Sequence, residues 1–419
     1  MSQARMARGF LWMAALAMAI GGWARGTLAD EAGDAFAPIT RFMEDRVAEG
    51  KLAGLSTLVA HQGEVVYFEN VGRRDIERDL PMTEDTLFRI HSMTKPIAAV
   101  ALMILYDEGR VALDDPIAKY IPEFADMRVY VSGKGDDMVT EPAARQITLL
   151  DVLTHQSGIS YSFFGPHPVH DIYEKVGLGD YGEGKPPFTL AEMMTRLSKV
   201  PLVFQPGTRW QYSMSTDVVA RVVEIVSGQP IGTFLKERIF DPLRMTDTAY
   251  FVADDKIERL SASYDIGSGK LVLADDPQTS IYRKAPVFAG GGSGLVSSAT
   301  DYFRFSQMLL NRGALDDVRI LKPETVDLMT SDHLYRDAGV KFIPGGGVGL
   351  GLGVVVDDTA EGQVPGSVGE YYWGGSSNTY FWINPRKDLV IVVMAQLRGR
   401  GQTFGDDIKE MVYEAYAGQ

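Results

Sequence analysis

The 419-residue chain contains no cysteine and only six histidines, and these absences exclude several kinds of function. Without cysteine the chain has no disulfide, no thiol nucleophile and no cysteine-ligated metal. Basic residues are not clustered, and the net charge is −14. Nucleic-acid binding needs a basic surface, so we expect no nucleic-acid partner. Nothing in the sequence calls for a metal or another cofactor, and we predict none.

Long apolar runs are also absent, apart from one near the N-terminus. Two arginines precede the run FLWMAALAMAI at residues 10–20, and Ala24 and Ala29 follow it as candidate cleavage points. The run is shorter than the ~20 residues needed to span a bilayer, so it predicts a signal peptide over residues 1–29 and not a membrane anchor. We expect a periplasmic or secreted protein without stable membrane insertion, or a cytoplasmic one if the leader is not used.

The rest of the chain predicts an α+β fold whose sheet is built from both termini. Alternating apolar residues predict a hairpin at residues 55–72, and strand-like runs return only in the last eighty or so residues. The residues between mix short helical segments with loops rich in proline and glycine. We expect an antiparallel sheet flanked by helices from residues 30–110 and 287–419. Residues 111–286 would form an inserted, mostly helical domain, with the active site between the two domains.

Two helices are predicted in the N-terminal part. Residues 36–49 carry apolar side chains at helical spacing and end at a glycine. The second helix runs from Ser92 to Gly109 and is apolar nearly all round, which is typical of a central buried helix.

The stretch HSMTK places Ser92 three residues before Lys95, at the predicted start of the second helix. Residues three apart share a helix face, so the hydroxyl and the amine can approach each other. A lysine acts as a base only when neutral, and burial disfavours the charged form. Alternatively, Ser92 only caps the helix and Lys95 is solvated. This is the only SxxK in the chain, and the rival nucleophile signature GxSxG is absent.

Five motifs then occur in order along the chain. They are HSMTKP (91–96), LTHQSG (153–158), FQPGTRWQYS (204–213), GGGSGLVSSATD (290–301) and YYWGGSSNTYFWINP (371–385). Together they resemble the serine beta-lactamase-like superfamily, in the branch of class C beta-lactamases and family VIII carboxylesterases. The resemblance covers nearly all of the chain after the leader. It implies the fold of beta-lactamases and penicillin-binding proteins, and chemistry through an acyl-enzyme.

The resemblance also implies catalytic roles. Ser92 would be the nucleophile, and Tyr212 would accept or relay its proton together with Lys95. The backbone N–H groups of Ser92 and Ser376 would form the oxyanion hole.

Substrate contacts are implied for Trp373, Gly374 and Gly375, which stand where beta-lactamases carry Lys-Thr-Gly. Trp373 thus replaces the lysine that meets the substrate carboxylate, and Met214 replaces the asparagine that follows the tyrosine. Both replacements weaken recognition of an anion and an amide, and they favour neutral esters.

We therefore predict a serine carboxylesterase (EC 3.1.1.-) that hydrolyses short-chain, small-molecule esters through an acyl-enzyme on Ser92. One alternative is a beta-lactamase or D-alanyl-D-alanine carboxypeptidase, with beta-lactams as substrates. Another is a non-catalytic penicillin-binding-like protein. Acyl transfer to an alcohol is an alternative to hydrolysis, and the oligomeric state is left open.

Three histidines, a glycine-rich run and several aromatic residues are not assigned catalytic roles. His155 in LTHQSG is interpreted as structural. His167 and His170 have a spacing that would hold a metal only with a third ligand, which the sequence does not indicate. The glycine-rich run at 345–353 lacks a nucleotide-binding pattern and predicts a strand face left bare for close packing. The aromatic residues expected to line an apolar acyl or alcohol pocket, or else to lie in the core, are Tyr161, Phe163, Phe164 and Tyr371.

Overall fold

The structure, a computed structural model, describes residues 24–179, 186–399 and 404–416. The predicted signal peptide at residues 1–29 lies mostly outside this part of the chain, so export stays a prediction.

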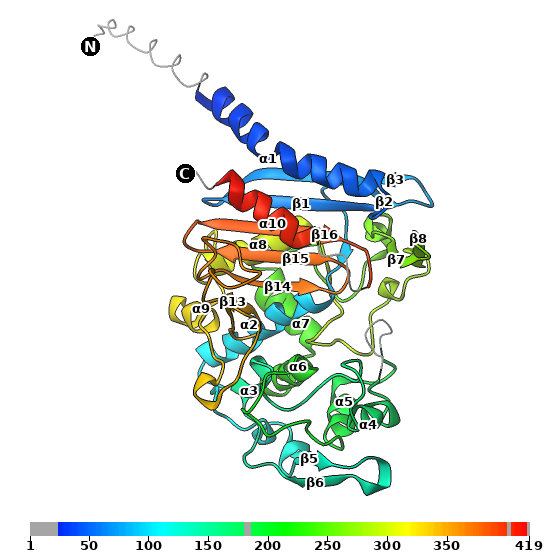
Figure 1. Ribbon diagram of the computed structural model, residues 1–419, viewed down its shortest axis with the longest axis vertical. Coiled ribbons are helices and arrows are strands. Elements are labelled where there is room, and N and C mark those ends of the chain that lie inside the picture. Colours follow the sequence, from blue (N-terminus) through cyan, green and yellow to red (C-terminus); the bar gives the residue numbers. More distant parts are fainter. Residues whose placement is uncertain (1–23, 180–185, 400–403, 417–419) are drawn as a thin grey trace, which may run out of the picture.

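An eight-stranded antiparallel sheet joins the two ends of the chain (Figure 1). Its strand order is β12-β13-β14-β15-β16-β1-β2-β3, so the N-terminal hairpin lies directly beside the last strand. The strands are β1 (Gly54–His61), β2 (Glu64–Asp75), β3 (Leu80–Pro81), β12 (Gly346–Val348), β13 (Gly353–Val355), β14 (Tyr371–Gly375), β15 (Thr379–Asn384) and β16 (Leu389–Ala395). The predicted fold class and the pairing of the two termini are confirmed.

The central strand β16, with the sequence LVIVVMA, is apolar at every position, which suits a strand with both faces buried. Val392 and Met394 face the core that contains α8 (Ala299–Leu310), whereas Ile391 and Val393 face the core formed with α1 (Ala24–Ala48) and α10 (Phe404–Ala415). Figure 1 shows α1 and α10 lying together over one side of the sheet.

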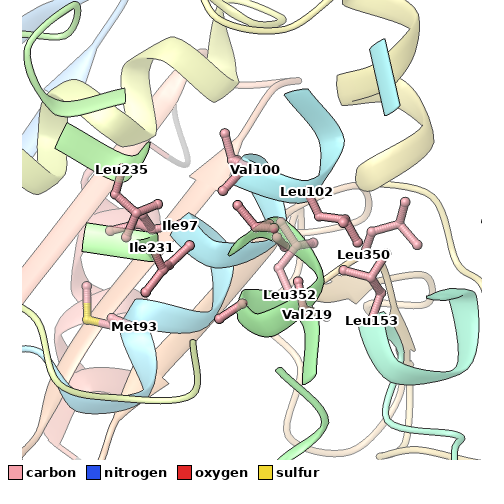
Figure 2. Close-up of a cluster of buried hydrophobic side chains, with 14 of the residues drawn as sticks. Met93, Ile97, Val100, Leu102, Leu153, Val219, Ile231, Leu235, Leu350 and Leu352 are labelled. Atoms are coloured by element: carbon pink, nitrogen blue, oxygen red, sulfur yellow. The ribbon is translucent and has the colours of Figure 1, made fainter. Parts of the chain in front are cut away.

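The predicted buried helix is α2 (Thr94–Asp107), and its residues from Thr94 to Leu105 are all buried. It packs against α6 (Ser215–Ser227), α7 (Ile231–Leu235), α3 (Leu149–Leu153) and the loop between β12 and β13. Figure 2 shows this cluster, whose labelled side chains are Met93, Ile97, Val100, Leu102, Leu153, Val219, Ile231, Leu235, Leu350 and Leu352. The sequence predicts the burial of α2 because the helix has no polar face that could be exposed to solvent.

The glycine-rich run beside α2 allows the expected close packing, but through a loop and not through a strand face, because residues 349–352 connect β12 to β13. A β-carbon at Gly351 would lie 2.4 Å from the β-carbon of Ala99. Only a residue without a side chain therefore fits between this loop and α2.

The middle of the chain contains more β-structure than predicted. Besides α4 (His170–Lys175) and α5 (Leu190–Leu197), it forms two hairpins, β5 (Arg128–Ser132) with β6 (Val139–Pro142) and β7 (Ser263–Gly267) with β8 (Lys270–Asp275). Several of their apolar residues are exposed, so the hairpins lack the clean alternation that marks a half-buried strand. Tyr264 of β7 packs in the same core as α1 and α10. The division into two domains stays a prediction.

We find no single helix in the described ranges that is long and apolar enough to cross a membrane. The segments Ser215–Ser227 and Ile231–Phe240 meet that criterion only as a pair, across a bend of 81°.

A buried ion pair ties α10 to the start of β14. The Lys409 Nζ lies 2.5 Å from the Glu370 Oε1, and both side chains are almost fully buried. The Tyr413 hydroxyl donates a hydrogen bond to the same carboxylate. Burial raises the pKa of Glu370, and the charge of Lys409 opposes this effect.

We expect Lys409→Met to lower the free energy of unfolding by about 3–5 kcal/mol, because it leaves a buried carboxylate without its counter-charge. Replacing both partners, with Glu370→Gln and Lys409→Met together, should cost clearly less than the single change. Urea denaturation followed by circular dichroism measures both. Equal losses in the single and double variants would show that the pair does not hold α10 through charge.

Candidate active site

Ser92, Lys95 and Tyr212 come together in the structure. The Tyr212 hydroxyl donates a hydrogen bond of 2.7 Å to the Ser92 Oγ, and the Lys95 Nζ lies 3.3 Å from the same oxygen. Ser92 and Lys95 share one face of consecutive helical turns, whereas Tyr212 comes from the segment just before α6. The serine oxygen thus touches two groups that are able to exchange protons with it.

The two structural alternatives for HSMTK are wrong. Ser92 lies in a single 3₁₀ turn, His91–Met93, and α2 begins only at Thr94. Neither helix start has a side-chain cap, so Ser92 does not act as one. Lys95 is 1% exposed and is therefore not a solvated surface residue.

The Lys95 amine is held by neutral partners. It donates a 2.7 Å hydrogen bond to the Gly292 carbonyl, and it lies 4.6 Å from the centre of the Tyr212 ring. No carboxylate in the described part of the chain forms an ion pair with it. Oriented dipoles and the face of an aromatic ring therefore surround this amine in place of a counter-charge.

The glycine-rich loop that accepts from Lys95 is anchored on the first turn of α6. The buried carboxylate of Asp217 accepts a 2.9 Å hydrogen bond from the Gly292 N–H. A β-carbon at Gly291 would lie 2.2 Å from the Thr216 carbonyl oxygen, so this position requires glycine. The motif GGGSG thus positions a carbonyl for the lysine, a role that the sequence did not reveal.

The Tyr212 ring is held among other rings. His155 packs edge-on against it at 5.0 Å between centroids, and Trp373 lies at 5.8 Å. The His155 Nδ1 is 3.0 Å from the Ser213 Oγ, and burial lowers the pKa of His155 to about 3. His155 therefore acts as a neutral packing partner of the tyrosine.

The strand β14 carries Trp373, Gly374 and Gly375 to the site. A β-carbon at Gly375 would lie 2.4 Å from the Ile90 carbonyl oxygen, so glycine lets the strand approach the turn that bears Ser92. Ser376 follows at the turn after β14, and its N–H donates no hydrogen bond within the described residues. The strand thus brings a free donor to the same side of the site as Ser92.

A cavity of about 1030 Å³ opens over Ser92. The residues that line it are His91, Ser92, Tyr161, Ser162, Phe163, Phe164, Glu174, Gly179, Trp210, Tyr212, Gly292, Ser293, Phe342, Trp373, Gly374, Gly375 and Ser376. Three of the four aromatic residues predicted for a pocket are here, whereas Tyr371 is part of the core. The substrate contact predicted for Met214 is wrong. Its side chain is fully buried in the core and does not line the cavity, because α6 begins immediately after it and turns the side chain inward.

The wall of this cavity is aromatic and carries little charge. Among its described lining residues there is no lysine or arginine, and the one acidic side chain is that of Glu174. Trp210 and Phe342 were not predicted as lining residues, and Phe342 lies in a loop that no sequence pattern connects to the site. A carboxylate on a ligand would find no cationic side chain among these residues.

His167 and His170 do not form a metal site with other residues of the described ranges. The His170 ring is 2.8 Å from the Gly165 carbonyl oxygen and 3.1 Å from the Ser160 Oγ, so both of its nitrogens have local partners.

The buried histidines predict how stability depends on pH. Burial lowers the pKa of His155, and that of His91, from 6.5 to about 3. Below pH 6.5 these histidines are therefore protonated in the unfolded chain but stay neutral in the folded chain. The free energy of unfolding falls as the pH drops toward 3. We expect His155→Asn to remove part of this loss, on the order of 2 kcal/mol between pH 7 and pH 5.

Urea unfolding of wild type and His155→Asn at pH 7, 6 and 5 measures that difference. The variant loses packing at every pH, so the slope is compared and not the absolute stability. Parallel curves would mean that His155 takes up its proton in the folded state.

Known proteins are similar to this chain in sequence and in structure. Residues 39–415 match the family described as Beta-lactamase. Protein Rv1367c of Mycobacterium tuberculosis is 37% identical over 355 residues, which cover 83% of this chain and 86% of that protein. Esterase EstB of Burkholderia gladioli is 31% identical over 380 residues, which cover 86% and 90%. The solved structure of EstCE1, titled a hydrolase with promiscuous acyltransferase activity, shares the fold, with a TM-score of 0.77 at 24% identity over 93% of this chain and 99% of that one. Because the family match spans nearly all of the described residues, the chain belongs to the beta-lactamase family of serine hydrolases.

Proposed function

We propose that this protein is a carboxylesterase that hydrolyses small-molecule esters, short-chain esters among them, through an acyl-enzyme on Ser92. One observation carries the proposal. The Ser92 Oγ is within hydrogen-bonding distance of both the Tyr212 hydroxyl and the Lys95 amine, beneath a cavity whose described lining residues include no lysine or arginine.

The reaction would proceed in two halves. The Ser92 oxygen attacks the ester carbonyl carbon while Tyr212 and Lys95 take its proton. The N–H groups of Ser92 and Ser376 stabilise the oxyanion, and the proton passes to the departing alcohol. Water then attacks the acyl-enzyme by the same route, and the acid leaves with Ser92 restored.

The cavity supports an ester more than a beta-lactam. Its volume of about 1030 Å³ accommodates a bulky acyl or alcohol group as well as a short chain. Beta-lactams and D-alanyl peptides carry a carboxylate, and Trp373 stands where a lysine would pair with it. The relative EstB is called an esterase, which agrees with this choice. A non-catalytic binding protein would have no need to hold Ser92, Lys95 and Tyr212 in contact.

We expect wild-type protein to hydrolyse p-nitrophenyl butyrate well and a chromogenic cephalosporin poorly, and Ser92→Ala to lose at least about 10⁴-fold in kcat on both. Ser367→Ala is a matched control, since its buried hydroxyl has no hydrogen-bond partner among the described residues and does not line the cavity. A preference for the cephalosporin would identify a beta-lactamase instead. Activity retained by Ser92→Ala would place the nucleophile elsewhere.

We expect Tyr212→Phe and Lys95→Met each to lower kcat about 10²- to 10⁴-fold, because each removes a group that exchanges protons with Ser92. Tyr212→Phe keeps the ring that packs on His155 and Trp373, so its fold should be preserved. Steady-state kinetics and the burst of p-nitrophenol measure acylation and turnover separately. Near-normal turnover in Tyr212→Phe would leave Lys95 as the sole proton acceptor.

A further inference from the structure

One side-chain hydrogen bond joins the turn of the nucleophile to the turn after β14. The His91 Nε2 lies 2.9 Å from the Ser377 Oγ, although the two residues are 286 positions apart in the sequence. Both side chains are buried, His91 being 6% exposed. The bond therefore links two segments that nothing local in the sequence holds together.

Each partner is the neighbour of a proposed oxyanion donor. His91 directly precedes Ser92, and Ser377 directly follows Ser376. An oxyanion hole works only when both N–H groups lie about 2.7–3.1 Å from the developing oxyanion. Here the two donors belong to separate turns, so their spacing depends on whatever connects those turns.

The backbone at His91 is held in an uncommon conformation. Its φ is 43°, in the left-handed region that non-glycine residues seldom adopt. Such a conformation is unfavourable by itself and persists only where the surroundings hold it in place. Two contacts hold the residue before His91. Gly375 approaches the Ile90 carbonyl closely, and the Thr379 Oγ1 donates a 3.4 Å hydrogen bond to the same oxygen.

The His91–Ser377 bond should not change across the working pH range. Burial, together with the nearby cations of Arg89 and Arg398, lowers the pKa of His91 to about 3. The ring is therefore neutral above pH 5, with one nitrogen donating and the other accepting.

We propose that the hydrogen bond between His91 and Ser377 positions the N–H groups of Ser92 and Ser376 relative to each other as one oxyanion hole. The two side chains are positioning residues, since they act through their neighbours. This inference rests on the proposed ester hydrolysis through Ser92. It gives a positioning role to His91, the histidine of HSMTK, and to Ser377, the second serine of WGGSS. The motifs themselves indicate no role for either residue.

The test compares Ser377→Ala, His91→Asn and the double variant with wild type, using p-nitrophenyl butyrate. Asparagine tolerates positive φ, so His91→Asn preserves the backbone while removing the ring. Misplacing one donor should lower kcat about 10- to 100-fold and change KM by less than about 3-fold, because the oxyanion exists only after attack. The double variant should lose no more than the worse single one, since both changes break one bond.

A boronic acid that forms a tetrahedral adduct with Ser92 provides a second readout. Its affinity should fall by about the same factor as kcat/KM in each variant. Ser367→Ala, another buried serine to alanine change, should alter neither value. Rates are expressed per active site titrated by the burst, so that a loss of folded protein is not counted as a loss of catalysis.

Three outcomes would overturn the inference. In the first, Ser377→Ala keeps kcat within twofold of wild type although wild-type hydrolysis depends on Ser92. In the second, the losses in the two single variants multiply in the double variant, which would mean that the residues act independently. In the third, wild type shows no ester hydrolysis, and the proposed function then fails together with the inference.

Discussion

A buried lysine amine in an otherwise apolar helix is the constraint on which the site depends. Lys95 lies in the first turn of α2, where every neighbouring residue is buried. An amine without partners in such a place would cost several kcal/mol. The Gly292 carbonyl, the Ser92 hydroxyl and the face of the Tyr212 ring supply those partners. Satisfying this one polar group therefore brings the Ser92 hydroxyl, a loop and an aromatic ring to the same point.

The start of α6 positions two of these partners, the Tyr212 ring and the Gly292 carbonyl. Tyr212 precedes the helix, and Asp217 in its first turn accepts from the Gly292 N–H and so aims the neighbouring carbonyl at the lysine. The first three glycines of the loop, at 290–292, have no room for a β-carbon against α6. A shift of α6 would thus move the tyrosine and the lysine's acceptor together, which keeps the geometry around Ser92 consistent.

The sheet contributes the other side of the site. Its strand β14 carries Gly375 to the turn of Ser92 and Trp373 to the cavity. The wall here is mainly rings, and rings bury apolar groups without satisfying a carboxylate.

The sequence by itself determined the parts that depend on local spacing or on ordered motifs. Alternation in the N-terminal hairpin and strand-like runs at the C-terminal end predicted the sheet, the unbroken apolar character of α2 predicted its burial, and the motif order grouped Ser92, Lys95 and Tyr212. Only the tertiary structure decided the contacts between segments far apart, such as Asp217 with Gly292, which are 75 residues apart, and His91 with Ser377. The tertiary structure also places the Met214 side chain in the core and Phe342 at the cavity. The reason is physical: periodicity records which face of an element is buried, but the partner it meets depends on how all elements pack together.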